Sequence, residues 1–337
     1  MKLKQVTVNG SGIKTPNFKM FGDKDKFENM INLTDKPLTD CIEQYLKYKC
    51  SNKKKSSMGK YAMLKKHINA IQEQDEVVLY PVVIGASFMN TFDEYLNDYG
   101  LASNTIVNIC AALKSIVKWS SLYGAKVADD LDDYKFKYQD AKPKLTLSPE
   151  EISRIYWFDI NKIDVRRQKK NTLKKVRDQF VLSCFFGQRF SDSKRISESN
   201  FVGANKNIFK IVQLKTENKA VVELDKIFEE YPMLVSKILE EYNYNAPYSG
   251  DISNFNRYLK ELFEYIGFNE ELKFEYKTNG QIVEKSFKKS KLISSHCARR
   301  TFITNAVKRG IHTQQIKRAS GHSSDTSFSK YVIWANT

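Results

Sequence analysis

The chain has 337 residues, of which 41% are hydrophobic and 12% aromatic, so it is not a disordered chain, and its length favours two domains. Lysine and arginine outnumber acidic residues by 55 to 39, a net charge of +16 that favours a polyanionic partner over the alternative of a solvated basic surface. No apolar run is long enough to span a bilayer, and five scattered cysteines without a CxxC pair favour the cytoplasm over a disulfide-rich setting.

Residues 1–36 are polar and show no sustained hydrophobic period, so we expect a short N-terminal arm. Four helices are expected within residues 37–124, and together they predict a compact all-α domain. Apolar positions at helical spacing begin these helices near Leu38, Tyr61, Phe88 and Ile106. Gly100 is expected to end the third helix, and Ser103 to cap the start of the fourth.

Residues 125–146 contain a cluster of aspartates, then four lysines and Pro143, a composition that predicts a linker. Directly after it, Ser148-Pro149-Glu150-Glu151 combines an N-cap, a proline at the first helical position and a glutamate at the third. This capping box is expected to open a second domain, residues 147–337.

The second domain is expected to mix helices and strands. Residues 172–186 have the apolar spacing of a helix, and helices are expected again from about residue 296. Two hairpins are predicted, one around Thr216-Glu217-Asn218 and one around Asn279-Gly280, because turn residues separate β-rich runs in both places.

Three short motifs in this domain carry residue types suited to phosphate chemistry. The first, Gly187-Gln188-Arg189-Phe190-Ser191-Asp192, follows the helix that ends at Phe186. The second is His296-x-x-Arg299, whose two residues share one face if a helix begins near His296. The third is Gly321-His322, with Tyr331 nine residues beyond the histidine. Each motif alone is weak, since such short combinations often arise by chance.

In this order, the motifs resemble those of the tyrosine recombinase, or phage integrase, family. The resemblance includes Leu214-Lys215-Thr216 in the first hairpin. Residues 101–106 are similar to the start of the last helix in the family's SAM-like core-DNA-binding domain, and residues 145–152 look like the opening of its catalytic domain. Gln188 departs from the family pattern, which commonly has leucine between the glycine and the arginine.

The resemblance implies a role for each motif residue. Arg189 and Arg299 would clamp the oxygens of a DNA phosphodiester, a task suited to planar, permanently charged guanidinium groups. His322 would donate a further hydrogen bond, and His296 would donate or accept a proton. Tyr331 would be the nucleophile, and surrounding positive charge would activate its phenol.

Two further roles follow from the same resemblance. Lys215 would protonate the leaving 5′ oxygen, although Lys210 and Lys219 stand nearby and hairpin lysines are usually only solvated. Asp192 would hold the cationic cluster in place. Of the two remaining histidines, His67 is expected on the flank of a helix and His312 at the surface or as a cap.

The basic excess is concentrated in residues 151–337, where 33 basic side chains stand against 21 acidic ones. Seven of them are candidates for salt-sensitive contacts with DNA, or are merely solvated. These are Lys169, Lys170, Lys174, Lys175, Lys288, Lys289 and Arg300.

The expected fold is mainly α. An all-α N-terminal domain precedes a mixed α+β catalytic domain of the DNA breaking-rejoining type, and the two would form a C-shaped clamp around duplex DNA. The expected function is site-specific recombination (integration, excision or inversion) through a 3′-phosphotyrosyl intermediate, without cofactor, metal or membrane. Monomers free in solution would assemble as a homotetramer on double-stranded DNA, with host DNA-bending proteins as accessory partners. Alternatives are DNA relaxation of the type IB topoisomerase kind, and a DNA-binding regulator that has lost catalysis.

Overall fold

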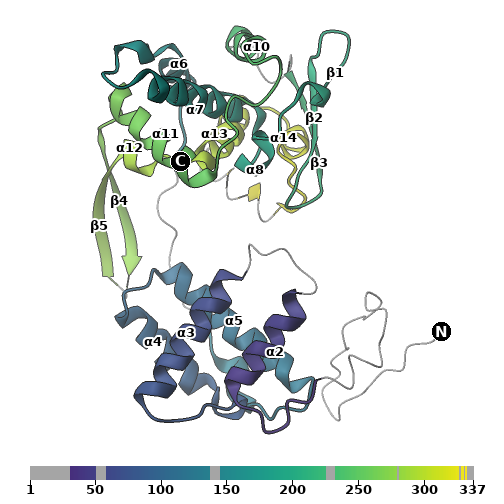
Figure 1. The fold of residues 1–337 in the computed structure, drawn as a ribbon, viewed down its shortest axis with the longest axis vertical. Helices are drawn as coiled ribbons and strands as arrows, with labels where there is room; N and C mark the ends of the chain where they lie inside the picture. Colours follow the sequence, from purple (N-terminus) through teal and green to yellow (C-terminus); the bar gives the residue numbers. More distant parts are fainter. Residues whose placement is uncertain are drawn as a thin grey trace, which may run out of the picture. The chain divides into compact units, whose positions relative to one another are not determined.

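The computed structural model describes residues 31–50, 58–136, 145–224, 232–278, 281–325, 328–329 and 331. The chain divides into two compact units, Met1–Ala141 and Lys142–Thr337 (Figure 1). Residues 1–30 of the expected N-terminal arm lie outside the described residues, as do residues 137–144 of the expected linker. In the described part of the chain, no helix is both long and apolar enough to cross a lipid bilayer.

The first unit contains the four expected helices, α2 (Leu38–Cys50), α3 (Gly59–Gln74), α4 (Ala86–Asp98) and α5 (Ser103–Ser121). Helix α5 is the centre of this unit, because α2, α3 and α4 all pack against it. Its apolar stripe, from Ile106 to Val117, is buried in their common core, as the 3.6-residue spacing requires. Ser103 is the first helical residue and not the cap, since Ala102 occupies the extended N-cap position.

The predicted linker is wrong for residues 125–134, which are part of the first unit. Ala125, Leu131 and Tyr134 are buried in its core. The Tyr134 hydroxyl donates to Oδ1 of Asp93 over 3.2 Å, and Asp130 accepts a hydrogen bond from the backbone N–H of Ala86. The aspartate-rich composition suggested a loop, but these aspartates belong to a short 3-10 helix, Asp129–Asp133, that Leu131 anchors.

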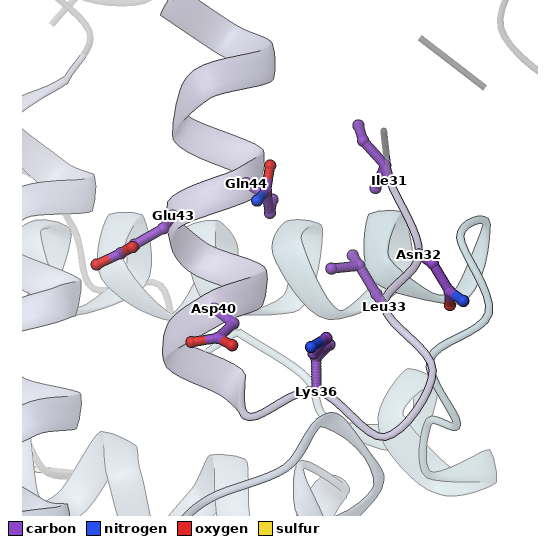
Figure 2. Close-up of a pocket in the computed structure, with 7 residues that line it drawn as sticks. All are labelled: Ile31, Asn32, Leu33, Lys36, Asp40, Glu43 and Gln44. Carbon is purple, nitrogen blue, oxygen red and sulfur yellow. The ribbon is translucent and has the colours of Figure 1, made fainter. Parts of the chain in front are cut away.

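The segment that leads into α2 also packs on the first unit. Leu33 is 2% exposed, and its backbone N–H donates to the carbonyl of Tyr123. Leu33 lines a small polar pocket with Ile31, Asn32, Lys36 and one face of α2, where Asp40, Glu43 and Gln44 lie (Figure 2). Residues 31–36 of the expected N-terminal arm are therefore part of the first unit, because Leu33 belongs to its core.

The second unit is built around α7 (Arg167–Phe186), which is longer than the helix predicted over residues 172–186. Four helices pack against it: α6 (Pro149–Trp157), α10 (Pro232–Glu241), α11 (Ile252–Ile266) and α13 (Ser295–Lys308). Helix α14 (Thr313–Ser320) packs on strand β3 (Lys219–Glu223). The described part of the unit also contains two short α-helices, α8 (Phe190–Ser193) and α12 (Lys289–Leu292). The predicted capping box is present at the start of α6: Ser148 Oγ accepts from the Glu151 N–H, and the Glu151 carboxylate accepts from the Ser148 N–H.

Both predicted hairpins are present as small antiparallel sheets. One has the order β1 (Phe201–Val202), β2 (Ile208–Val212) and β3 (Lys219–Glu223), with Phe209 opposite Val222. The other pairs β4 (Glu271–Thr278) with β5 (Gln281–Lys288). The expectation of a mainly α fold with a mixed second domain is confirmed, and the first sheet lies beside α14 (Figure 1).

Candidate active site

The turn after α7 places Arg189. Helix α7 ends at Gly187 with φ +63°, and a Cβ atom there would lie 2.3 Å from the ring of Phe302 on α13. Glycine both permits this left-handed conformation and lets α13 approach the end of α7. The chain then reverses, so that half-buried Arg189 occupies the N-cap position of the short helix α8.

Arg299 lies in the second turn of α13 and is 1% exposed. Its Nη1 donates to the backbone oxygens of Gly187, at 2.9 Å, and Ser320, at 2.6 Å, so the guanidinium joins the ends of α7 and α14. Burial, and then repulsion from Arg189, lower the pKa of Arg299 to about 10. The interaction with Tyr331 acts in the opposite direction and raises this pKa. Arg299 therefore stays protonated at neutral pH.

His322 follows Gly321, which ends α14 with φ +68°. The Ser320 hydroxyl donates to the backbone oxygen of Ile316, so its oxygen accepts from Nδ1–H of His322, 2.7 Å away. This tautomer leaves Nε2 to accept from Nη2 of Arg299 at 3.0 Å. Burial, and then the charges of Arg299 and Arg189, lower the pKa of His322 to about 3, so the imidazole is neutral at neutral pH.

Tyr331 is 8% exposed and lies against these groups. Its ring meets the His322 imidazole edge to face, with 5.4 Å between ring centroids. Its hydroxyl lies 3.5 Å from Nε2 of His296, an exposed residue in the first turn of α13. The structure thus gathers His296, Arg299, His322 and Tyr331, and Arg189 is close enough to act on the pKa values of Arg299 and His322.

Asp192 is fully buried on α8. Its Oδ1 accepts from the backbone N–H of Leu214 at 2.8 Å and lies 3.6 Å from Nη1 of Arg195. Its Oδ2 is buried and has no hydrogen-bond partner among the described residues. The Asp192 carboxylate favours the protonated form of Arg299, and its contact with Leu214 fixes the turn between β2 and β3.

Lys215 lies exposed on that turn. The turn is tied to the site on both sides of it: Nη1 of Arg189 donates to Oε1 of Gln213 at 2.6 Å, and Nδ2 of Asn218 donates to the Gly321 carbonyl at 3.2 Å. The motifs did not single out Gln213 or assign a role to Gln188, although both are buried at the centre of these contacts. In the sequence, Gln188 is marked only by its position next to Arg189, and Gln213 only by its position two residues before Lys215.

The candidate DNA-contacting residues differ widely in environment. Lys289 is 8% exposed and forms ion pairs with Glu151 and Glu270, so its charge is already used inside the fold. Lys169 pairs with Glu261, Lys174 with Asp178 and Glu241, and Nζ of Lys170 donates to the Asn161 carbonyl. Arg300 is half-buried on α13, whereas Lys175 and Lys288 are exposed. His312 caps α14 by accepting from the Gln314 N–H, as expected, and His67 is buried on α3 against Tyr95.

Comparison with known proteins agrees with this architecture. Residues 37–120 match the phage integrase SAM-like domain family. Across 88% of this chain, the structure is similar to lambda integrase bound as a dimer to a core site (16% identity, 95% of that chain, TM-score 0.61). It is also similar to the Tn1549 transposon integrase (15% identity, 94% of that chain, TM-score 0.58) and to the XerH site-specific recombinase (12% identity, 92% of that chain, TM-score 0.56), again across 88% of this chain. None of the curated proteins compared matches the sequence.

The fold is therefore the one seen in the integrase and tyrosine recombinase structures, as the motifs indicated.

Proposed function

We propose that this protein is a site-specific DNA recombinase that cuts and rejoins DNA through a covalent bond to Tyr331. The observation that carries the proposal is the environment of Arg299. It is a buried, protonated guanidinium that contacts a neutral imidazole, His322, and a buried phenol, Tyr331. Among the described residues, no carboxylate forms an ion pair with Arg299. A buried cation of this kind is suited to bind an anion, and a phenol beside it is placed to attack that anion.

In the proposed reaction, Arg189 and Arg299 bind the non-bridging oxygens of a DNA phosphodiester. The Tyr331 oxygen attacks phosphorus, the bond to the 5′ oxygen breaks, and a 3′-phosphotyrosyl bond forms. His296, 3.5 Å from the phenol oxygen, accepts the phenol proton. The departing 5′ oxygen takes a proton from Lys215 on the exposed turn. To donate to the phosphate, His322 must carry its ring proton on Nε2, so the proton leaves Nδ1, which faces Ser320 in the DNA-free structure.

The reaction exchanges one phosphodiester bond, to the 5′ oxygen, for another, to the Tyr331 oxygen, so the free energy of the ester bond is retained. A 5′ hydroxyl from a second DNA strand can therefore attack the phosphotyrosyl bond and release Tyr331 without a nucleotide cofactor. Strand exchange between two DNA sites requires four protomers, which we propose as a homotetramer. The lambda integrase relatives were solved as a dimer on a core site and as a tetramer on a Holliday junction, which supports this stoichiometry.

Affinity for the DNA backbone would come from basic side chains that are not held in ion pairs. Lys175 and Lys288 are the strongest candidates because both are exposed. Lys289 is not part of the proposal, since Glu151 and Glu270 hold its ammonium group inside the fold. Each phosphate contact would add a salt-dependent, sequence-independent increment to binding.

The test uses a duplex taken from the junctions of the DNA that flanks the gene. A nick just downstream of the cleavage position lets the short fragment with the free 5′ hydroxyl diffuse away after attack, so that rejoining is prevented. The proposal predicts a protein–DNA adduct that survives SDS. A regulator without catalysis would bind the duplex and give no adduct. Relaxation of supercoiled DNA by isolated monomers, with no joining of two sites, would favour a topoisomerase over a recombinase.

A further inference from the structure

Two glutamine side chains are buried directly beside Arg189. Gln188 is 1% exposed and Gln213 is 0% exposed, although they come from the turn after α7 and from the end of β2. Their amides face each other, with Nε2 of Gln213 2.8 Å from Oε1 of Gln188. A buried amide is stable only when its donors and acceptor are matched, so this pair defines a chain of hydrogen bonds with a fixed direction.

The backbone sets that direction. One amide atom of Gln188 lies 2.7 Å from the carbonyl of Phe186 and 2.8 Å from that of Ala319, and it must be the nitrogen because both partners accept. The Gln188 oxygen then faces Gln213 and accepts from its nitrogen. That nitrogen also donates to the Ser320 carbonyl at 2.8 Å, so the Gln213 oxygen faces Nη1 of Arg189.

The Ser320 carbonyl is shared. It accepts from Gln213 and, at 2.6 Å, from Nη1 of Arg299. A single neutral amide therefore links the two guanidiniums: its oxygen binds Arg189, and its nitrogen binds the carbonyl that holds Arg299. The Arg189 and Arg299 guanidiniums repel each other, and the oriented dipole of the Gln213 amide offsets part of that repulsion. Because the amide is neutral, it adds no charge that would compete with a phosphate for the two arginines.

We propose that Gln213 is a positioning residue that holds Arg189 beside Arg299, and that the Gln188 amide fixes its orientation. The inference rests on the proposed function, because the geometry that it maintains is that of a two-arginine phosphate clamp. Close packing supports it: a Cβ atom at Gly321 would lie 2.6 Å from Cδ of Gln213, so the end of α14 lies directly on the amide.

Gln213 also organises the turn that carries Lys215. The Thr216 hydroxyl donates to the same Oε1 at 3.0 Å. The Gln213 backbone N–H donates to the Asn218 carbonyl, and its carbonyl accepts from the Glu217 N–H. Gln213 thus fixes the position of Arg189, which would bind the phosphate, and the conformation of the turn that carries Lys215, which would protonate the leaving oxygen.

The test compares Gln213→Met with Gln179→Met. Methionine has a similar size and removes all four hydrogen bonds of the Gln213 side-chain amide. Gln179 is an equally buried glutamine of the same unit, whose amide bonds to the Ser193 carbonyl and the Tyr248 N–H instead. Single-turnover cleavage of the nicked duplex, below the melting temperature of both variants, is followed as a function of DNA concentration.

For Gln213→Met, the cleavage rate at saturating DNA should fall about 10- to 100-fold, with the half-saturating DNA concentration changed less than about threefold. Gln179→Met should keep the rate within about threefold. In an Arg189→Ala background, Gln213→Met should cause a clearly smaller further loss, because the arginine that it positions is gone and only its contacts with the Lys215 turn remain. Equal losses for the two methionine variants, or an undiminished loss in the Arg189→Ala background, would overturn the positioning role.

A readout without catalysis separates this inference from the proposed function. In protein with 15N-labelled arginine, the Nη signals of Arg189, assigned by their loss in Arg189→Ala, should show slowed rotation of the guanidinium. Fast rotation in the wild-type protein would contradict the inference even if Gln213→Met failed to fold. A wild-type protein that forms no adduct but shows slowed Arg189 rotation would refute the recombinase and retain the positioning contact.

Discussion

The phenol ring of Tyr331 meets the imidazole of His322 edge to face, with 5.4 Å between the ring centroids. Nη2 of Arg299 hydrogen-bonds to His322, and Tyr331 is close enough to Arg299 to favour its protonated form. The ring contact with His322 holds the largely buried Tyr331 close to the Arg299 guanidinium, near the ends of α7, α13 and α14. It also makes the charge state of His322 important for stability.

Protonation of His322 should lower stability in acid. Its pKa is about 3 in the folded chain, against an ordinary value of 6.5. As the pH falls from about 6.5 to about 3, the unfolded chain takes up a proton that the folded chain refuses, so the free energy of unfolding decreases in this window. The melting temperature of the wild type should therefore fall more steeply between pH 7 and pH 4.5 than that of His322→Gln. Parallel curves would mean that His322 is not buried beside the arginines.

Arg299→Lys should remove function and weaken the fold together. Lysine keeps the charge but cannot reproduce the donors that reach Gly187, Ser320 and His322. An unsatisfied buried carbonyl costs about 1–3 kcal/mol, and loss of one such donor in a catalytic site lowers rates about 100- to 1,000-fold. The control is Arg257→Lys, on the exposed face of α11, which should leave adduct yield and melting temperature unchanged. An Arg299→Lys protein that forms adduct at the wild-type rate would remove Arg299 from the clamp.

Gly187→Ala and Gly310→Ala form a matched pair. Both glycines have positive φ, +63° and +72°, so alanine at either position costs about 1–2 kcal/mol of backbone strain. Only at Gly187 would the new methyl group collide with Phe302, whereas nothing lies within 4 Å at Gly310. Gly187→Ala should therefore lower both the melting temperature and the cleavage rate, and Gly310→Ala only the former. Equal cleavage rates would show that the approach of α13 to α7 does not govern the site.

Salt dependence should separate exposed lysines from the buried one. Lys175→Gln and Lys288→Gln should each reduce the slope of log affinity against log salt by about 1, since each removes one phosphate contact. Lys289→Gln should leave the slope unchanged and lower the melting temperature, because Glu151 and Glu270 lose their partner. Fluorescence anisotropy across a salt series measures the slopes. A change of slope for Lys289→Gln alone would reverse this assignment.

The elements that the sequence predicted are those whose signals are local. The capping box at Ser148, the four helices of the first unit and both hairpins rest on side chains only a few residues apart. The prediction did not identify α10 and α11, although α11 has a buried apolar stripe from Phe255 to Ile266. The aspartate-rich segment was misjudged because its composition hid one anchoring residue, Leu131.

The candidate site divides in the same way. Its candidate catalytic residues stand in ordered motifs, and the structure brings five of them together, namely Arg189, His296, Arg299, His322 and Tyr331. Gln213 could not be assigned a role from the sequence, because its partner Gln188 lies 25 residues away and its other acceptor, the Ser320 carbonyl, lies 107 residues away. Every residue has a backbone carbonyl, so the sequence cannot indicate which carbonyl will accept a hydrogen bond from a distant side chain. Contacts made by the carbonyls at helix ends can therefore be identified only from the folded structure.

Mass-spectrometric identification of the residue linked to DNA, in adduct trapped with the nicked duplex, tests the central claim most directly. We predict a single 3′-phosphotyrosyl peptide that contains Tyr331, and a Tyr331→Phe protein that binds the duplex with wild-type affinity and yields no adduct. A linkage to any other residue, or an adduct that persists in Tyr331→Phe, would contradict the account.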